Sequence, residues 1–144
     1  MTKLISKFEV KFGMIQAFGG IDGIHVELNR PLKNAQDYFC YKQYFSLNVQ
    51  VVCNSKGYFI DVNEEKMFTN STINKKLIEP QTLYSLNGYH SIFNYLIGDP
   101  AYPLTSFCIK EFQSCYNKEE GIFNKTLSSA RNQVECAIGR LKAR

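Results

Sequence analysis

The 144-residue chain has no tryptophan, two histidines, five cysteines and no long hydrophobic run. The cysteines include no C-x-x-C pair and their number is odd, so we expect no disulfide framework and a reducing intracellular compartment. Two histidines among scattered cysteines do not favour a structural zinc site. The N-terminal segment lacks the apolar stretch of a signal peptide, and no segment reaches a membrane-spanning length. The sequence therefore predicts neither a secreted nor a membrane protein.

The residues that are present suffice for one hydrophobic core. Hydrophobic residues make up 44% of the chain and charged residues 21%, and the aromatic residues are all Phe and Tyr. We expect residues 1–144 to form a single domain. The net charge of +4 is compatible with a polyanionic partner. Positive charge is concentrated in residues 124–144, where five Lys and Arg residues accompany a single acid, Glu135.

Hydrophobic periodicity predicts a mixed α/β domain, with a sheet flanked by helices. Alternating or continuous apolar residues predict strands at 15–28, 45–53, 58–62 and 94–97, the second and third joined as a hairpin. Three-four spacing predicts helices at 3–12 and 127–141, with a shorter helical turn at 74–78 and no clear assignment for 83–95 or 104–117. Residues Cys53 and Cys136 fall in apolar patterns and are expected in the core.

Two aspartates stand at unusual places in the predicted strands. Asp22 lies between Gly20 and Gly23 within the first strand, where a carboxylate is unfavourable to bury unless it is paired or bound to a metal. The alternative is that Asp22 belongs to an ordinary turn. Asp99 follows the short apolar strand directly, and ligands often bind beyond the ends of such strands.

A third acid borders the apolar stripe of the last helix, which Val134 and Leu141 centre. Glu135 lies about a quarter turn from that stripe, on the same flank as Arg131. An intrahelical ion pair with Arg131 is the simpler interpretation of this glutamate. If Asp22, Asp99 and Glu135 converge instead, their oxygens suit Mg²⁺ or Mn²⁺.

Four sequence blocks then resemble one family. They are Gly20-Ile-Asp-Gly-x-His, Tyr44-Phe-Ser-Leu-Asn-Val-Gln-Val-Val-Cys, Gly98-Asp-x-Ala-Tyr-Pro-Leu, and Asn124-x-x-Leu-Ser-x-Ala-Arg-x-x-x-Glu-x-Ala-x-Gly-Arg-Leu-Lys. In this order they resemble the DDE superfamily endonuclease domain of PIF/Harbinger transposases and the nucleases derived from them. The resemblance extends over about residues 8–144.

The resemblance implies an RNase H-like fold and metal-dependent attack on DNA phosphodiester bonds. By motif, Asp22, Asp99 and Glu135 become the catalytic and metal-binding acids, with two Mg²⁺ or Mn²⁺ ions. Phosphate contacts are expected from four basic residues, Lys42, Arg131, Lys142 and Arg144. His25 either orients a ligand or is a structural histidine. The resemblance further implies a location in the nucleus or the cytoplasm, and partners that include DNA, a separate DNA-binding protein or further copies of the chain.

The chain also departs from the family pattern. Relatives carry Pro-Gly-Ser-x-His-Asp after the hairpin, whereas residues 69–74 read Thr-Asn-Ser-Thr-Ile-Asn. We also expect that the chain lacks the N-terminal helical region of full-length relatives. These departures favour an alternative function: a domesticated or truncated transposase fragment that binds DNA, or a DNA-binding partner, without cutting it. A further alternative is an unstable relic of a decayed element.

Overall fold

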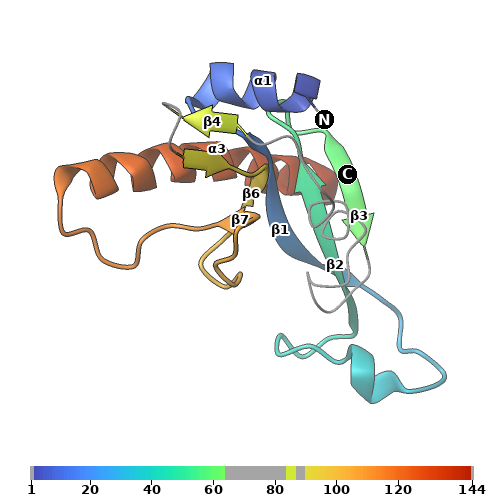
Figure 1. Cartoon of the computed structure of the whole chain (residues 1–144). Coiled ribbons are helices and arrows are strands. Elements are labelled where there is room, and N and C mark those ends of the chain that lie inside the picture. Colours follow the sequence, from blue (N-terminus) through green and yellow to red (C-terminus); the bar gives the residue numbers. More distant parts are fainter. Residues whose placement is uncertain (1, 64–83, 87–89, 144) are drawn as a thin grey trace.

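A computed structural model describes residues 2–63, 84–86 and 90–143 and shows a mixed β-sheet flanked by two helices (Figure 1). The elements, in chain order, are α1 (Thr2–Phe12), β1 (Ala17–Glu27), the 3₁₀ helix η1 (Ala35–Tyr38), β2 (Ser46–Cys53), β3 (Phe59–Asn63), β4 (Tyr84–Leu86), β5 (His90–Ile92), β6 (Tyr95–Ile97), β7 (Cys108–Ile109) and α3 (Lys118–Lys142). The predicted fold class is confirmed: the architecture is that of an α/β, RNase H-like domain.

Strand β1 is the centre of the five-stranded sheet, whose order is β3-β2-β1-β6-β7. It pairs antiparallel with β2 and parallel with β6, and β6 in turn pairs parallel with β7. The antiparallel pair β4 and β5 forms a separate small sheet. Since β1, β6 and β7 run in the same direction, their carboxyl ends reach the same end of the sheet.

Helix α3 covers the face of β1 that carries the even-numbered residues from 20 to 24. A Cβ atom on Gly20 would lie 3.3 Å from Cγ1 of Val134, so glycine allows the helix to approach the strand closely. Ile24 packs in one cluster with Val134 and Ala137. Asp22 lies between Gly20 and Ile24 on this same face, and is only partly buried.

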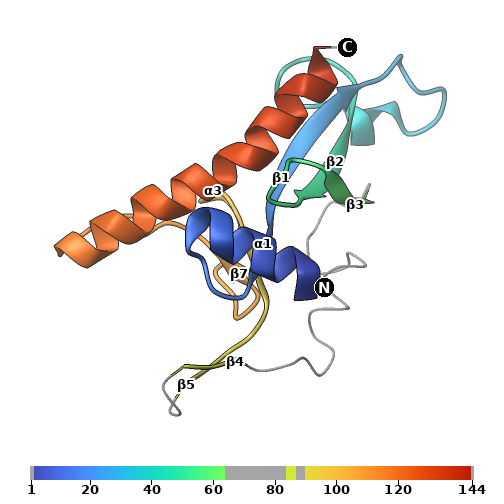
Figure 2. The same ribbon diagram turned by 90° about the horizontal axis from the view of Figure 1, so that it is seen from above.

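Helix α1 lies at the end of the sheet where β1 begins, next to α3 (Figures 1 and 2). Its Phe8 is fully buried in a cluster with Leu127 of α3. Its Lys11 Nζ donates hydrogen bonds of 2.8 Å to the Ser55 carbonyl oxygen and to Oε1 of Gln133. These bonds tie α1 to the β2–β3 turn and to α3, and so hold the three elements together.

Helix α3 begins nine residues earlier than the apolar stripe predicts, and its first half extends past the sheet (Figure 2). Asn117 caps it, because its Oδ1 accepts a 2.8 Å hydrogen bond from the Glu120 amide. The Glu120 carboxylate accepts in return from the Tyr116 amide at 2.7 Å. These two bonds, one to Asn117 and one from the preceding Tyr116, fix the start of the helix although residues 118–126 have no buried stripe.

Two predictions about this helix were wrong. Cys136 is exposed, because it lies about 200° around the helix from the buried Val134. Leu141 points to the same side as Val134 but is 49% exposed, since Ile138 is the last residue of α3 that packs in the core.

Other predictions were confirmed or lie outside the described residues. The β2–β3 hairpin turns at Gly57, with φ of +77°, and the buried strand before Asp99 is β6. All five cysteines are free, and Cys53 is buried as expected. The predicted helical turn at 74–78 and the altered segment 69–74 lie outside the described residues. Within the described ranges, no helix is both long enough and apolar enough to cross a membrane.

The exposed Gly139 offers a test of how α3 is stabilised. No atom lies within 4 Å of the position that its Cβ would occupy, so Gly139→Ala introduces no clash. Alanine loses less backbone entropy than glycine in a helix, and we expect the free energy of unfolding to rise by about 0.5–1 kcal/mol. Urea denaturation followed by circular dichroism measures the change. A loss of stability would mean that this turn of α3 is not an ordinary exposed helix.

Candidate active site

Asp22 and Asp99 follow paired positions of two adjacent parallel strands. Gly20 of β1 pairs with Ile97 of β6. Asp22 comes two residues after Gly20, and Asp99 comes two residues after Ile97. Parallel strands keep this correspondence as they continue. The sequence singled out both acids independently, and the structure places each of them two residues beyond the same paired position, Gly20 with Ile97.

The surroundings of Asp22 are those of a carboxylate near other carboxylates. Burial raises the pKa of Asp22, and the negative charges of Asp99 and Glu135 raise it further. The Gly23 amide, which donates a 2.7 Å hydrogen bond to Oδ1 of Asp22, and the Arg131 guanidinium act in the opposite direction. Asp22 of β1 therefore interacts electrostatically with Asp99, which follows β6, and with Glu135 of α3.

The turn that follows β6 holds Asp99 in place. Its Oδ1 accepts a 2.8 Å hydrogen bond from the Ala101 amide, and its carbonyl oxygen accepts from the Tyr102 amide at 3.1 Å. The same turn directs Tyr102 back onto the sheet, where its hydroxyl accepts a 3.2 Å bond from Nε2 of Gln50. Burial raises the pKa of Tyr102 to about 12, and the nearby Asp22 and Asp99 contribute to that rise.

Glu135 is paired within its own helix. The Nε of Arg131 donates a 3.0 Å hydrogen bond to Oε1 of Glu135, which is the intrahelical ion pair that the spacing predicted. Nη1 of the same guanidinium lies 3.7 Å from Oε1 of Glu111. Arg131 thus stands between two carboxylates, one on α3 and one in the segment after β7.

Glu111 is a residue that the sequence analysis missed. Ile97 pairs with Ile109 in β7. Asp99 comes two residues after Ile97, and Glu111 comes two residues after Ile109. Asp22, Asp99 and Glu111 therefore follow equivalent positions of three neighbouring parallel strands. Because β7 has only two residues, periodicity could not reveal it. An acid placed shortly after a short β-prone segment was the available signal.

The chemistry of these side chains fits a divalent cation. Mg²⁺ and Mn²⁺ prefer carboxylate oxygens, and mutual repulsion among acids, such as that at Asp22, favours binding of a cation. Among the described residues, however, no three His, Cys, Asp or Glu side chains already surround one point. The Glu135 carboxylate is turned toward Arg131, while the carboxylates of Asp22 and Asp99 each accept a hydrogen bond from a backbone amide. Rotation of these carboxylates is needed before they could share an ion.

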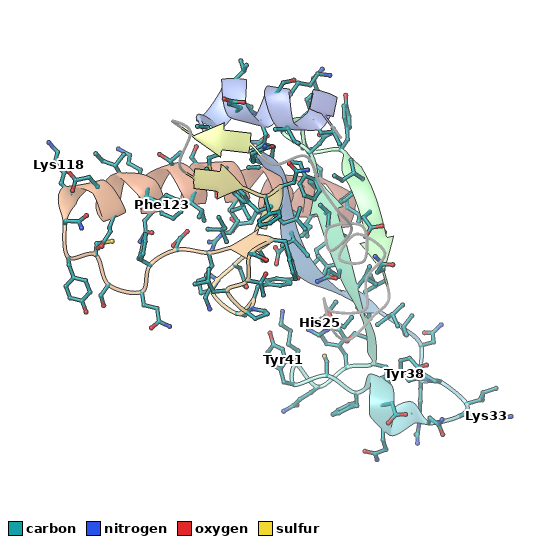
Figure 3. The ribbon with its side chains drawn as sticks, viewed as in Figure 1. His25, Lys33, Tyr38, Tyr41, Lys118 and Phe123 are labelled. Atoms are coloured by element: carbon teal, nitrogen blue, oxygen red, sulfur yellow. The ribbon has the colours of Figure 1, made fainter. Side chains whose placement is uncertain are left out.

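The remaining predicted residues are His25 and basic residues in segment 28–45 and at the C-terminal end of α3. His25 lies at the base of the segment 28–45, with Nδ1 3.0 Å from Oγ of Ser46 and its ring edge-on to Tyr41 (Figure 3). Lys42 is exposed, with Nζ 5.7 Å from the centre of the Tyr41 ring. Lys142 is exposed in the last turn of α3, and Arg144 lies outside the described residues.

Segment 28–45, called the arm below, projects from the sheet between β1 and β2 (Figure 1). It carries three basic residues, Arg30, Lys33 and Lys42, against one acid, Asp37. Tyr41 is 81% exposed on it. The arm is thus a positively charged and aromatic extension, and it continues directly from β1, the strand that carries Asp22.

Comparison with known proteins assigns the family. A curated relative, Protein ALP1-like of Arabidopsis thaliana, is 24% identical over 159 aligned positions, which cover 100% of this chain and 39% of that protein. The chain thus spans about two fifths of the length of this relative. No solved structure matches. The family model described as DDE superfamily endonuclease matches residues 21–144, a range that includes all three predicted acids, and the chain therefore belongs to the DDE superfamily endonucleases.

Proposed function

We propose that the chain is a transposase-derived nuclease that cleaves DNA phosphodiester bonds with the help of divalent metal ions bound by Asp22, Asp99 and Glu135. Membership of the endonuclease family supports the reaction class. The observation that carries the proposal is that Asp22 and Asp99 each lie two residues beyond the paired Gly20 and Ile97, with Asp99 and Glu135 close enough to raise the pKa of Asp22. We also propose that the protein acts in the nucleus, where its DNA substrate is located.

The acids have distinct tasks in this proposal. Bound Mg²⁺ or Mn²⁺ supplies the charge that activates water and stabilises the leaving oxygen of a phosphodiester. The backbone of Asp22 is held by β1 and that of Asp99 by the turn after β6, so only their carboxylates have to rotate to share an ion. Glu135 completes the site after its carboxylate separates from Arg131. Asp22 must be ionised for binding, so metal affinity rises as the pH passes upward through its raised pKa.

The arm is suited to contact DNA to one side of the cleaved bond. Its excess of positive charge complements the phosphate backbone, and the exposed Tyr41 ring offers a surface for stacking or packing. From Asp22 to the end of β1 at Glu27 is five residues, or about 17 Å of strand. DNA bound at the acids would therefore reach the arm within a few nucleotides. Contacts of this kind position DNA without reading its sequence.

Cleavage of supercoiled plasmid in Mn²⁺ or Mg²⁺ tests the proposal. We expect metal-dependent nicking by the wild-type chain and a loss of more than about 100-fold in Asp99→Asn, because removing a direct ligand exceeds the effect of losing an outer-sphere partner. Glu119→Gln, which removes the charge of an exposed acid in the first turn of α3, about 24 Å along the helix from Glu135, is the control and should retain activity. Equal cleavage by wild type and Asp99→Asn, or cleavage by neither, contradicts the proposal.

The second candidate function is DNA binding without cleavage. The ion pair between Arg131 and Glu135 favours it, because this pair occupies the third acid. Electrophoretic mobility shift of labelled duplex DNA in the absence of metal distinguishes the two functions. Retention of DNA together with no cleavage in any metal supports the binding function, whereas metal-dependent nicking supports the nuclease.

A further inference from the structure

Glu111 lies beside Arg131, the arginine that pairs with Glu135, and none of the proposed catalytic steps employs it. Its Oε1 is buried and, within the described part of the chain, accepts no hydrogen bond. The Nη1 atom of Arg131 lies 3.7 Å away, within ion-pair range but beyond hydrogen-bond distance. A buried acceptor that is left unsatisfied is unfavourable, so a small movement of the guanidinium toward Glu111 would be stabilising.

The same guanidinium is hydrogen-bonded to Glu135 at 3.0 Å. Arginine has several donors in a planar fork, so one guanidinium can bond to either carboxylate or to both. The Arg131 and Glu111 side chains are 21% and 26% exposed, whereas that of Glu135 is 44% exposed. The ion pair with Glu111 is thus the less exposed of the two, so solvent screens the attraction between its charges less.

We propose that Glu111 is a positioning residue that takes Arg131 away from Glu135 when a divalent cation binds. The proposal rests on the proposed function, since Glu135 is the ligand that is released. Where it lies in the structure, Arg131 neutralises Glu135 and lessens the repulsion among the acids near Asp22. When a cation takes over that task, the guanidinium shifts to the unsatisfied Oε1 of Glu111 instead of remaining beside the metal.

A double-mutant cycle on Mn²⁺ affinity, measured by isothermal titration calorimetry, tests the proposal without relying on turnover. We expect Glu111→Gln to weaken Mn²⁺ binding by about two- to fivefold, the range of a partly exposed ion pair. Arg131→Gln should tighten binding, because it removes the competitor for Glu135. In the Arg131→Gln background, Glu111→Gln should then have little further effect.

Glu119→Gln is the matched control, because it makes the same charge change at an exposed acid in the first turn of α3, about 24 Å along the helix from Glu135. It should leave Mn²⁺ affinity unchanged. An equal loss from Glu111→Gln in both backgrounds would mean that Glu111 acts directly by its charge, and overturns the proposal, as does no loss in the wild-type background. Absence of Mn²⁺ binding by the wild-type chain overturns the proposed function itself, and this inference with it. Circular dichroism of each variant confirms that the comparison is between folded proteins.

Discussion

Asp22→Asn is expected to abolish metal-dependent DNA cleavage and at the same time to stabilise the metal-free protein. Loss of a direct metal ligand should reduce cleavage by more than about 100-fold. The folded protein gains because burial and the charges of Asp99 and Glu135 disfavour the ionised form of Asp22. Asparagine has no charge to bury, and its side-chain oxygen can still accept the hydrogen bond from the Gly23 amide.

The pH dependence follows from the direction of the pKa shift. A carboxyl group whose pKa is raised by folding binds its proton more tightly in the folded than in the unfolded chain. Its contribution to stability is therefore greatest below the ordinary value of 3.8 and falls as the pH rises through the raised pKa. Above that pKa the loss is constant. The difference in stability between Asp22→Asn and wild type should thus widen with pH and then level off.

Urea denaturation of both proteins from about pH 4 to pH 7, without metal, measures this difference. Asp37→Asn is the control, because Asp37 is an exposed acid of η1. Addition of Mn²⁺ should stabilise the wild type but not Asp22→Asn, since only binding to the folded state raises stability. If Asp22→Asn is less stable than wild type at pH 7, the ionised carboxylate is already compensated in the metal-free fold, and the account of Asp22 as a repelled acid is wrong.

Short-range sequence patterns predicted the parts of the fold that depend on one face of one element. The alternation of β2, the turn at Gly57 and the apolar run of β6 all have this character, and each is present. Segment 118–126 of α3 was not predicted because it extends past the sheet and has no apolar stripe. Its capping box at Asn117 and Glu120 was the usable local signal.

The candidate site was predicted only in part, and for a physical reason. Sequence spacing and family resemblance identify Asp22, Asp99 and Glu135 as individual acids, but their relation depends on which strands are neighbours and in what register. Long-range pairing of this kind is not encoded in a local pattern. Glu111 shows the consequence: only the pairing of Ile97 with Ile109 brings it to the level of Asp99.

The register that positions these acids depends on the core, and Ile97→Ala tests that dependence. Ile97 is fully buried in a cluster with Leu127 and Ala130 of α3, and it pairs with Gly20 and Ile109. Truncation to alanine leaves a cavity between β6 and α3, and we expect the free energy of unfolding to fall by about 2–5 kcal/mol. Such a loss is a large fraction of the stability of an ordinary domain. Urea denaturation measures it.

Leu104→Ala is the matched control, since Leu104 is 68% exposed and its truncation should change stability by less than about 0.5 kcal/mol. Mn²⁺ binding then separates a general loss of stability from damage to the site. Asp99 follows Ile97 by two residues, and α3 carries Glu135. A cavity between β6 and α3 should therefore also weaken Mn²⁺ binding under conditions in which the variant is fully folded. Unchanged Mn²⁺ affinity in folded Ile97→Ala would mean that the turn holding Asp99 to the Ala101 amide, and not the packing of β6 on α3, sets the position of the acid.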